Sequence, residues 1–105
     1  MLTILNTSII TEYGCYQYSP LTLKDARKLV TKDYIRSAIG HESTAQVIST
    51  LLGIDCPKNR MTYRQRPGDV ALIFKLNSRP PEGKILSVDD IEDIGYSWGK
   101  LERIS

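Results

Sequence analysis

His41 is the only histidine of the chain, and it stands in the segment Gly40-His41-Glu42-Ser43-Thr44, where a helical pattern begins. Backbone N–H groups in the first turn of a helix have no partner within the helix, and they can hold a phosphate. An imidazole at that position can donate a proton to a leaving oxygen of the phosphate. The helix dipole disfavours a protonated histidine there, so the bound phosphate would have to restore the proton. A plain helix start, capped by Ser43 or Thr44 with His41 on the surface, fits the same residues.

A basic cluster follows in residues 58–84 and includes Lys58, Arg60, Arg64, Arg66, Arg79 and Lys84. Arginine can bind a phosphate through two parallel N–H bonds. Residues two apart share a face of a strand, so a strand over residues 60–65 predicts that Arg60 and Arg64 point the same way. A solvated strand face explains the same charges without a ligand.

Polar residues also follow two of the predicted strands. In the segment 77–84, Arg79 and Glu82 can form a structural clamp; alternatively, Arg79 can hold a phosphate while Glu82 orients a ribose hydroxyl. The group Asn6-Thr7-Ser8 follows the first predicted strand, where polar side chains are placed for a ligand at the end of an open sheet. These three residues are also ordinary turn formers, which is the simpler interpretation of the sequence alone.

Hydrophobic patterning predicts the elements that position these residues. Short apolar or alternating runs predict strands over residues 2–5, 60–65, 70–76 and 100–104. Residues 15–18 either form a second strand or lead into a loop. The turn signal in residues 66–69 joins two of them into a β-hairpin at about residues 60–76. Helices are predicted over residues 23–30, 42–52 and 87–94, with Thr22 and Ser87 at two starts and Gly53 at one end. The predicted fold class is mixed α/β: a single domain over residues 1–105, with a sheet of about five strands flanked by short helices.

Length, charge and composition limit the kinds of protein that this chain can be. The 105 residues fit one domain, and the net charge of +2 argues against a protein that coats duplex nucleic acid. Cys15 and Cys56 have no metal-ligand spacing, which predicts two half-buried thiols in a reducing cytosol and no metal site. There is neither a signal-peptide pattern nor a run of apolar residues long enough to span a bilayer, so we expect a cytoplasmic protein.

Three blocks of the sequence resemble the viral ring nucleases, the type III anti-CRISPR proteins of archaeal viruses, phages and related mobile elements that degrade cyclic tetra-adenylate. The blocks are Ile39-Gly40-His41-Glu42-Ser43-Thr44, Lys58-Asn59-Arg60 and Ser78-Arg79-Pro80-Pro81-Glu82-Gly83-Lys84. They follow in the family's order with similar gaps. The resemblance covers most of residues 35–94 and extends more weakly into the first predicted strand.

The resemblance implies roles for individual residues. His41 is expected to be the general acid, and Arg79 and Glu82 are expected to belong to the same catalytic pocket. A serine after the first strand also belongs to the family's site, and because this segment is one residue shorter here, Ser8 is the candidate and Thr7 the alternative. The expected ligand-binding residues are Ser8, Thr7, Asn6, Gly40, Ser43, Arg60 and Lys84.

The resemblance also implies a symmetric homodimer, in which the two copies of His41 face one pocket. The 2′-hydroxyl of a cyclic tetranucleotide can attack the neighbouring phosphorus, which removes the need for a protein nucleophile. The resemblance thus implies a metal-independent phosphodiesterase with no cofactor that cleaves cyclic tetra-adenylate to linear di-adenylates. We expect it to act in the cytoplasm, the host's if the chain is viral. Two alternatives stay open: a non-catalytic nucleic-acid-binding protein, and a sponge that sequesters a cyclic nucleotide.

Overall fold

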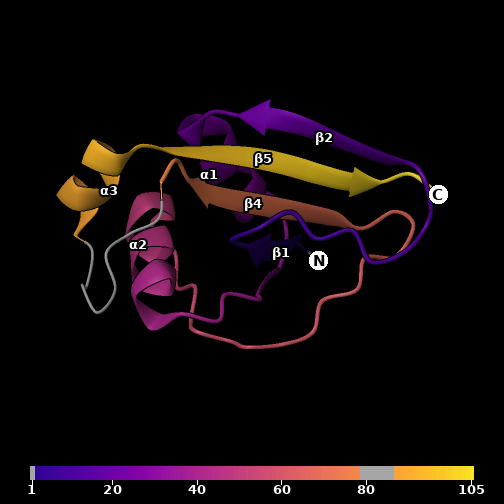
Figure 1. Ribbon diagram of the computed structural model, residues 1–105, viewed down its shortest axis with the longest axis horizontal. Helices are drawn as coiled ribbons and strands as arrows, with labels where there is room; N and C mark the ends of the chain where they lie inside the picture. The colour runs from indigo at the N-terminus through magenta and orange to yellow at the C-terminus, as the bar shows by residue number, and fades with distance from the viewer. Residues whose placement is uncertain (1, 79–86) are drawn as a thin grey trace.

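A five-stranded mixed sheet forms the centre of the computed structural model, which describes residues 2–78 and 87–105 (Figure 1). The strand order is β2-β5-β4-β1-β3. The strands are β1 (Leu2–Leu5), β2 (Tyr16–Leu21), β3 (Ile35–Ser37), β4 (Val70–Leu76) and β5 (Tyr96–Arg103). Strand β1 is parallel to β3 and β4, whereas β5 is antiparallel to β2 and β4. The predicted α/β class and five-stranded mixed sheet are confirmed.

Three helices flank the sheet: α1 (Leu23–Lys32), α2 (Glu42–Leu52) and α3 (Val88–Ile94). Two of them start with the side-chain caps that the sequence predicts. The Thr22 hydroxyl accepts from the Asp25 N–H at 3.1 Å, and Ser87 forms a reciprocal capping box with Asp90. Gly53 ends α2 in the left-handed conformation at φ 69°, which glycine adopts without a steric penalty.

The helices pack against one face of the sheet and form the larger core. This cluster contains Leu2 and Ile4 of β1, Leu72 and Phe74 of β4, Trp98 of β5, and the apolar sides of the three helices. The rings of Phe74 and Trp98 lie 5.0 Å apart between their centroids. None of the helices in the described part of the chain is long and apolar enough to cross a bilayer.

The opposite face, which none of these three helices covers, is here called the open face. The chain that leads from α2 to β4 crosses it. In Figure 1 this segment runs along the sheet from the α2 end to the start of β4. Its Tyr63 side chain packs with Leu5, Ala71, Ile73 and Leu101 in a second, smaller cluster.

The predicted hairpin at residues 60–76 is wrong. Residues 55–66 belong to no helix or strand, and β4 pairs with β1 and β5 instead. The predicted alternation exists, because Tyr63 and Gln65 are buried while Arg64 and Arg66 are exposed. It arises from an extended segment lying flat on the sheet, since both edges of β4 are already occupied.

Other boundaries and burial predictions need smaller corrections. Strand β2 extends beyond the predicted residue 18 to Leu21, and Pro20 is tolerated because β2 is at the edge of the sheet. Strand β5 begins at Tyr96, four residues before the predicted start. The two cysteines are not alike, because Cys15 is exposed and Cys56 is buried.

Candidate functional site

The carboxyl ends of β1, β3 and β4 lie together, because these strands are parallel neighbours. In Figure 1 the arrowheads of β1 and β4 point toward the end of the sheet where α2 and α3 lie. The Ala38 N–H donates to the Ile4 carbonyl at 2.9 Å and so extends the β1–β3 pairing past the end of β3. The segment that leads to His41 therefore leaves the sheet beside the segment that begins at Asn6.

His41 is the N-cap residue of α2, with φ −123° and ψ 129°. Its side chain is exposed and forms no capping hydrogen bond. Within the described chain, no hydrogen bond is formed by the backbone N–H groups of Ser43 or Thr44. The prediction that Ser43 or Thr44 caps this helix is wrong, because both residues lie inside its first turn. An exposed imidazole thus stands at a helix start whose N–H groups are available to an anion.

Arg60 lies next to this helix start. The Asn59 N–H donates to the Ile39 carbonyl at 2.8 Å, and the Asn59 side-chain amide donates to the Ser37 carbonyl at 2.7 Å. These bonds fix the 58–60 segment against the chain that leaves β3. A Cβ atom placed on Gly40 would lie 3.6 Å from Arg60 Nε, so the guanidinium approaches the Gly40 backbone closely. The structure thus brings Arg60 close to the start of α2, although Arg60 is not on a strand as predicted, and its role as a ligand-binding residue stays a prediction.

Asn6, Thr7 and Ser8 directly follow β1, as predicted. Thr7 is exposed, and Asn6 and Ser8 are half-buried. They share the carboxyl end of the sheet with Gly40 and His41, but the described chain contains no hydrogen bond between the two groups. The structure therefore places these three residues at the same end as His41 and leaves their roles as predictions.

Arg79, Glu82 and Lys84 lie outside the described residues. The chain enters their segment from the carboxyl end of β4, where the Asn77 N–H donates to the Gly95 carbonyl at 2.9 Å. The side chains assigned to the catalytic pocket thus follow a strand that ends at the same side of the sheet as β1 and β3. The described residues contain no group of three or more His, Cys, Asp or Glu side chains that could hold a metal ion.

The chain matches a protein family over residues 2–98, nearly its whole length. It belongs to the STIV B116-like family. A member of this family, B116 of Sulfolobus turreted icosahedral virus, has a solved structure that superimposes with a TM-score of 0.80 at 29% sequence identity. The match covers 96% of this chain and 97% of B116, so the two share one fold over almost their full lengths.

Similar proteins come from archaeal viruses and from a bacterium. Protein YddF of Bacillus subtilis is 35% identical over 98% of this chain and 97% of its own length. Protein 26 of Sulfolobus islandicus filamentous virus is 32% identical over 100% of this chain and 93% of its own length. The STIV B116-like family thus includes members in archaeal viruses, as the resemblance implied.

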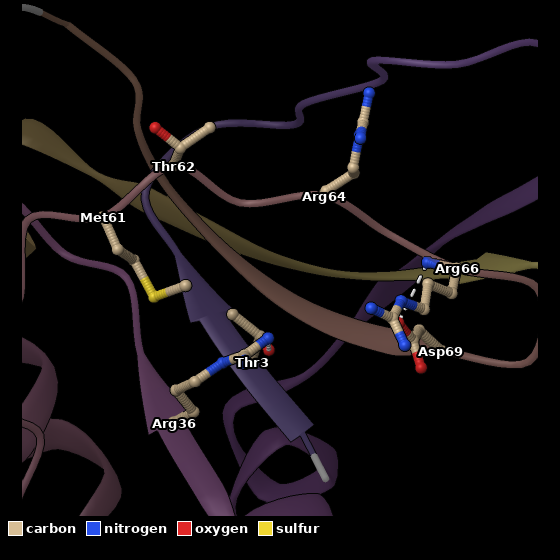
Figure 2. A pocket seen from close by; sticks show the side chains of 7 residues that line it. All are labelled: Thr3, Arg36, Met61, Thr62, Arg64, Arg66 and Asp69. Atoms are coloured by element: carbon tan, nitrogen blue, oxygen red, sulfur yellow. Dashed lines mark hydrogen bonds between the residues drawn. The ribbon is translucent and has the colours of Figure 1, made fainter.

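The open face of this STIV B116-like chain carries a pocket that the sequence analysis missed. The pocket has a volume of about 420 Å³ and is lined by Thr3, Arg36, Met61, Thr62, Arg64, Arg66 and Asp69 (Figure 2). Spacing in the sequence gives no sign of Arg36, because it lies 24 residues before Arg60 on a strand of only three residues. The sequence shows the charge of Arg64 and Arg66, but their position relative to β1 and β3 depends on the path of the 57–69 segment.

Burial changes the acidity of two side chains near these sites. Burial raises the pKa of the Tyr63 hydroxyl, and the nearby Thr3 side chain and Arg36 guanidinium counteract this shift in part. Burial also raises the pKa of the Cys56 thiol, which the Ser37 side chain counteracts in part. Both groups therefore ionise at a higher pH than usual, Tyr63 in the smaller cluster of the open face and Cys56 in the larger cluster with α2.

Proposed function

We propose that this protein is a metal-independent ring nuclease that cleaves cyclic tetra-adenylate to linear di-adenylates and so antagonises type III CRISPR signalling. The observation that carries the proposal is the start of α2. There, an exposed His41 replaces a capping side chain, and Arg60 lies against Gly40. Such a helix start suits a phosphodiester, because free N–H groups and a proton donor of one segment lie beside the guanidinium of another.

The proposed reaction needs no protein nucleophile. The 2′-oxygen of one ribose forms a bond to the adjacent phosphorus, the bond from phosphorus to the 5′-oxygen breaks, and the 2′-hydroxyl proton is released to water. His41, protonated when the phosphate is bound, donates a proton to the leaving 5′-oxygen. Each cleavage leaves a 2′,3′-cyclic phosphate and a 5′-hydroxyl, and two cleavages of the ring yield two di-adenylates.

The remaining roles rest on the resemblance to the ring nucleases. Arg79 would stabilise charge on the phosphate in the transition state, and Glu82 would share the catalytic pocket. Asn6, Thr7, Ser8 and Lys84 would contact the ligand. We propose a symmetric homodimer, in which each subunit supplies one such set to a shared pocket that matches the two-fold symmetry of the ring. Because its substrate would be a signalling molecule of the cell, we place the protein in the cytoplasm, the host's if the chain is viral.

The test is to incubate the protein with cyclic tri-, tetra- and hexa-adenylate in excess chelator and to separate the products by chromatography. We expect cyclic tetra-adenylate to give di-adenylate with a 2′,3′-cyclic phosphate. His41→Ala should lower the cleavage rate by about 10²–10⁴-fold, the usual contribution of a general acid, while ring binding persists. Lys28→Gln on the exposed side of α1 is the matched control and should retain the wild-type rate.

Other outcomes would contradict the proposal in different ways. A ring that is bound but never cleaved would show a sponge. Cleavage that stops in chelator would show a metal-dependent enzyme, and wild-type activity in His41→Ala would remove the proposed acid. Tight binding of duplex DNA with a steep salt dependence, and none of the cyclic ligand, would favour a nucleic-acid-binding protein.

A further inference from the structure

We infer that the open-face pocket is a second anion site, in which Arg36 and Arg66 hold the phosphate group of a nucleotide or of a short oligonucleotide. This site is separate from the start of α2, and it stands whether or not the protein cleaves a cyclic nucleotide. Its size fits such a ligand, because about 420 Å³ lies within the usual range of roughly 300–1,000 Å³ for small-molecule sites.

The pocket brings together charges from separate parts of the chain. Arg36 comes from β3, and Arg64 and Arg66 come from the segment that crosses the open face. In Figure 2 Arg36 lies beside Thr3 of β1, Arg66 and Asp69 lie together near the start of β4, and Arg64 extends away from them. Three guanidinium groups thus line the pocket against one carboxylate, which gives it a positive potential.

Two of the three arginines have no ion-pair partner within the described chain. Arg64 Nε lies 2.9 Å from Glu12 Oε1, so the charge of Arg64 is partly neutralised. Neither Arg36 nor Arg66 forms such a pair with another residue of 2–78 or 87–105. The carboxylate of Asp69 is already engaged locally, because its Oδ2 accepts from the Arg66 backbone N–H at 2.9 Å and so fixes the turn before β4.

Arg36 is held in position before any ligand binds. Its Nη2 donates to the Thr3 hydroxyl at 3.2 Å, and its Cζ lies 5.8 Å from the centroid of the Tyr63 ring. Thr3 is only 2% exposed and lies within β1, so it is a rigid anchor. The remaining N–H groups of this guanidinium form no hydrogen bond within the described chain. A guanidinium fixed in this way loses less conformational entropy on binding a phosphate.

A buried hydroxyl beneath the pocket supports the same inference. Tyr63 is 3% exposed, and its hydroxyl has no hydrogen-bond partner of acceptable geometry in the described chain. Thr3, Arg36 and Asp69 are close enough to influence its pKa. A buried donor without a partner is unfavourable, and an oxyanion bound to the remaining N–H groups of Arg36, with the Thr3 contact intact, would bring an acceptor nearer to it.

The experiment measures binding to the full chain with probes that the proposed cleavage reaction cannot consume. The probes are inorganic phosphate, trithymidylate with and without a 5′-phosphate, and thymidine, all of which lack a 2′-hydroxyl next to a phosphodiester. We expect the phosphate-containing probes to shift the backbone amide NMR signals of Arg36, Thr62 and Arg66 saturably, and thymidine to leave them unchanged. Binding only with the 5′-phosphate would identify a phosphomonoester ligand, and equal binding of both trinucleotides would identify a phosphodiester; either result supports the site.

A charge-matched pair of variants makes the test specific. Arg36→Gln/Arg66→Gln should weaken binding of the phosphate probe by roughly tenfold for each charged hydrogen bond lost. Lys24→Gln/Lys28→Gln, two exposed positions on α1, lowers the net charge equally and should leave the affinity within about twofold, because distant surface charges are screened. Retained amide dispersion in the NMR spectrum would verify that both pairs fold.

The inference is overturned if neither phosphate nor phosphorylated trithymidylate gives a saturable shift at these amides. It is also overturned if the two double variants lose affinity equally, since the effect would then reflect net charge. His41→Ala should bind the trinucleotide as the wild type does. Failure of the cyclic-nucleotide assay would therefore not affect this result, and the reverse also holds.

Discussion

The two faces of the sheet are built in different ways. The helix face is covered by α1, α2 and α3, and the buried members of its cluster come from three of the strands, β1, β4 and β5. The open face is covered by an irregular segment whose main apolar contact is Tyr63. Two neighbouring residues of β4 lie on opposite faces of the sheet. Leu72 belongs to the first cluster and Ile73 to the second, and both are fully buried.

Hydrogen bonds from polar side chains stabilise the open face, whereas apolar packing stabilises the helix face. Gln65 donates to the carbonyls of Asp69 and Leu101, each at 2.8 Å. Arg103 in turn donates to the Gln65 carbonyl at 2.6 Å and to the Tyr13 carbonyl at 3.1 Å. Because this segment pairs with no strand, side chains must supply the hydrogen-bond partners of its buried backbone N–H and C=O groups. The same arrangement leaves its arginines pointing outward, which is how this face acquires a pocket.

The largest expected effect is a loss of unfolding free energy on substituting β4 residues, one from each face of the sheet. We expect Leu72→Ala to lower the free energy of unfolding by about 4–5 kcal/mol and Ile73→Ala by about 2–3 kcal/mol, within the range for buried aliphatic residues. The difference arises because an irregular segment can settle into a cavity more readily than packed helices can. Urea denaturation measures both values, and an equal or larger loss for Ile73→Ala would refute the proposed difference in rigidity.

An intermediate effect is expected from the polar contacts of the open face. Arg103→Met should lower the free energy of unfolding by about 2 kcal/mol, because the buried Gln65 carbonyl loses its donor. Limited proteolysis should then cut within residues 57–69 sooner than in the wild type.

Arg64→Met is the matched control for that variant. Arg103 Nη1 lies 3.8 Å from Glu12 Oε2, and Arg64 pairs with the same carboxylate. The Arg64 side chain is 75% exposed, so its loss should change the free energy of unfolding by less than about 0.5 kcal/mol. If both substitutions cost the same, Arg103 does not hold the open face together.

The smallest effect at neutral pH concerns the Tyr63 hydroxyl. Tyr63→Phe should change the free energy of unfolding by less than about 0.5 kcal/mol at pH 7, because the hydroxyl has no partner to lose. At high pH the two proteins should diverge. The pKa of Tyr63 in the folded chain lies above its ordinary value of 10.0, so the unfolded chain releases the proton first. The wild type therefore loses stability as the pH rises above about 10, until it passes the folded-state pKa.

Denaturation between pH 8 and pH 11.5 or so checks this divergence, a range that brackets the phenol's ordinary pKa of about 10. Tyr34→Phe, whose side chain is 85% exposed, controls for the loss of one phenol. Parallel pH profiles for wild type and Tyr63→Phe would show that the hydroxyl is not buried as described.

The helix face could be predicted from the sequence because its signals are local. Thr22, Gly53 and the Ser87–Asp90 capping box each act within a few residues of a helix end, and the apolar side of α2 follows the helical period. The start of α2 was found in the same way, and with it the exposed position of His41.

The open face could not be predicted because alternation indicates one-sided burial, not pairing. Residues 60–66 alternate as a strand would, but whether such a segment joins a ladder depends on which edges of β4 are free. That in turn depends on β1 and β5, which lie far away in the sequence. The proximity of Arg60 to Gly40 has the same origin, since it follows from the Asn59 contacts to residues 37 and 39.

The unusual start of α2 has a consequence for how this chain can evolve. Helices α1 and α3 carry hydroxyl caps, whereas α2 has an imidazole that caps nothing. A Ser or Asp at that position would typically strengthen the domain by about 1 kcal/mol. A mutant library screened for heat resistance alone would therefore drift toward replacing His41, and a library screened under ligand selection would keep it. The identity of residue 41 in each pool would show whether the chain retains its histidine for folding or for a molecule that it meets in the cell.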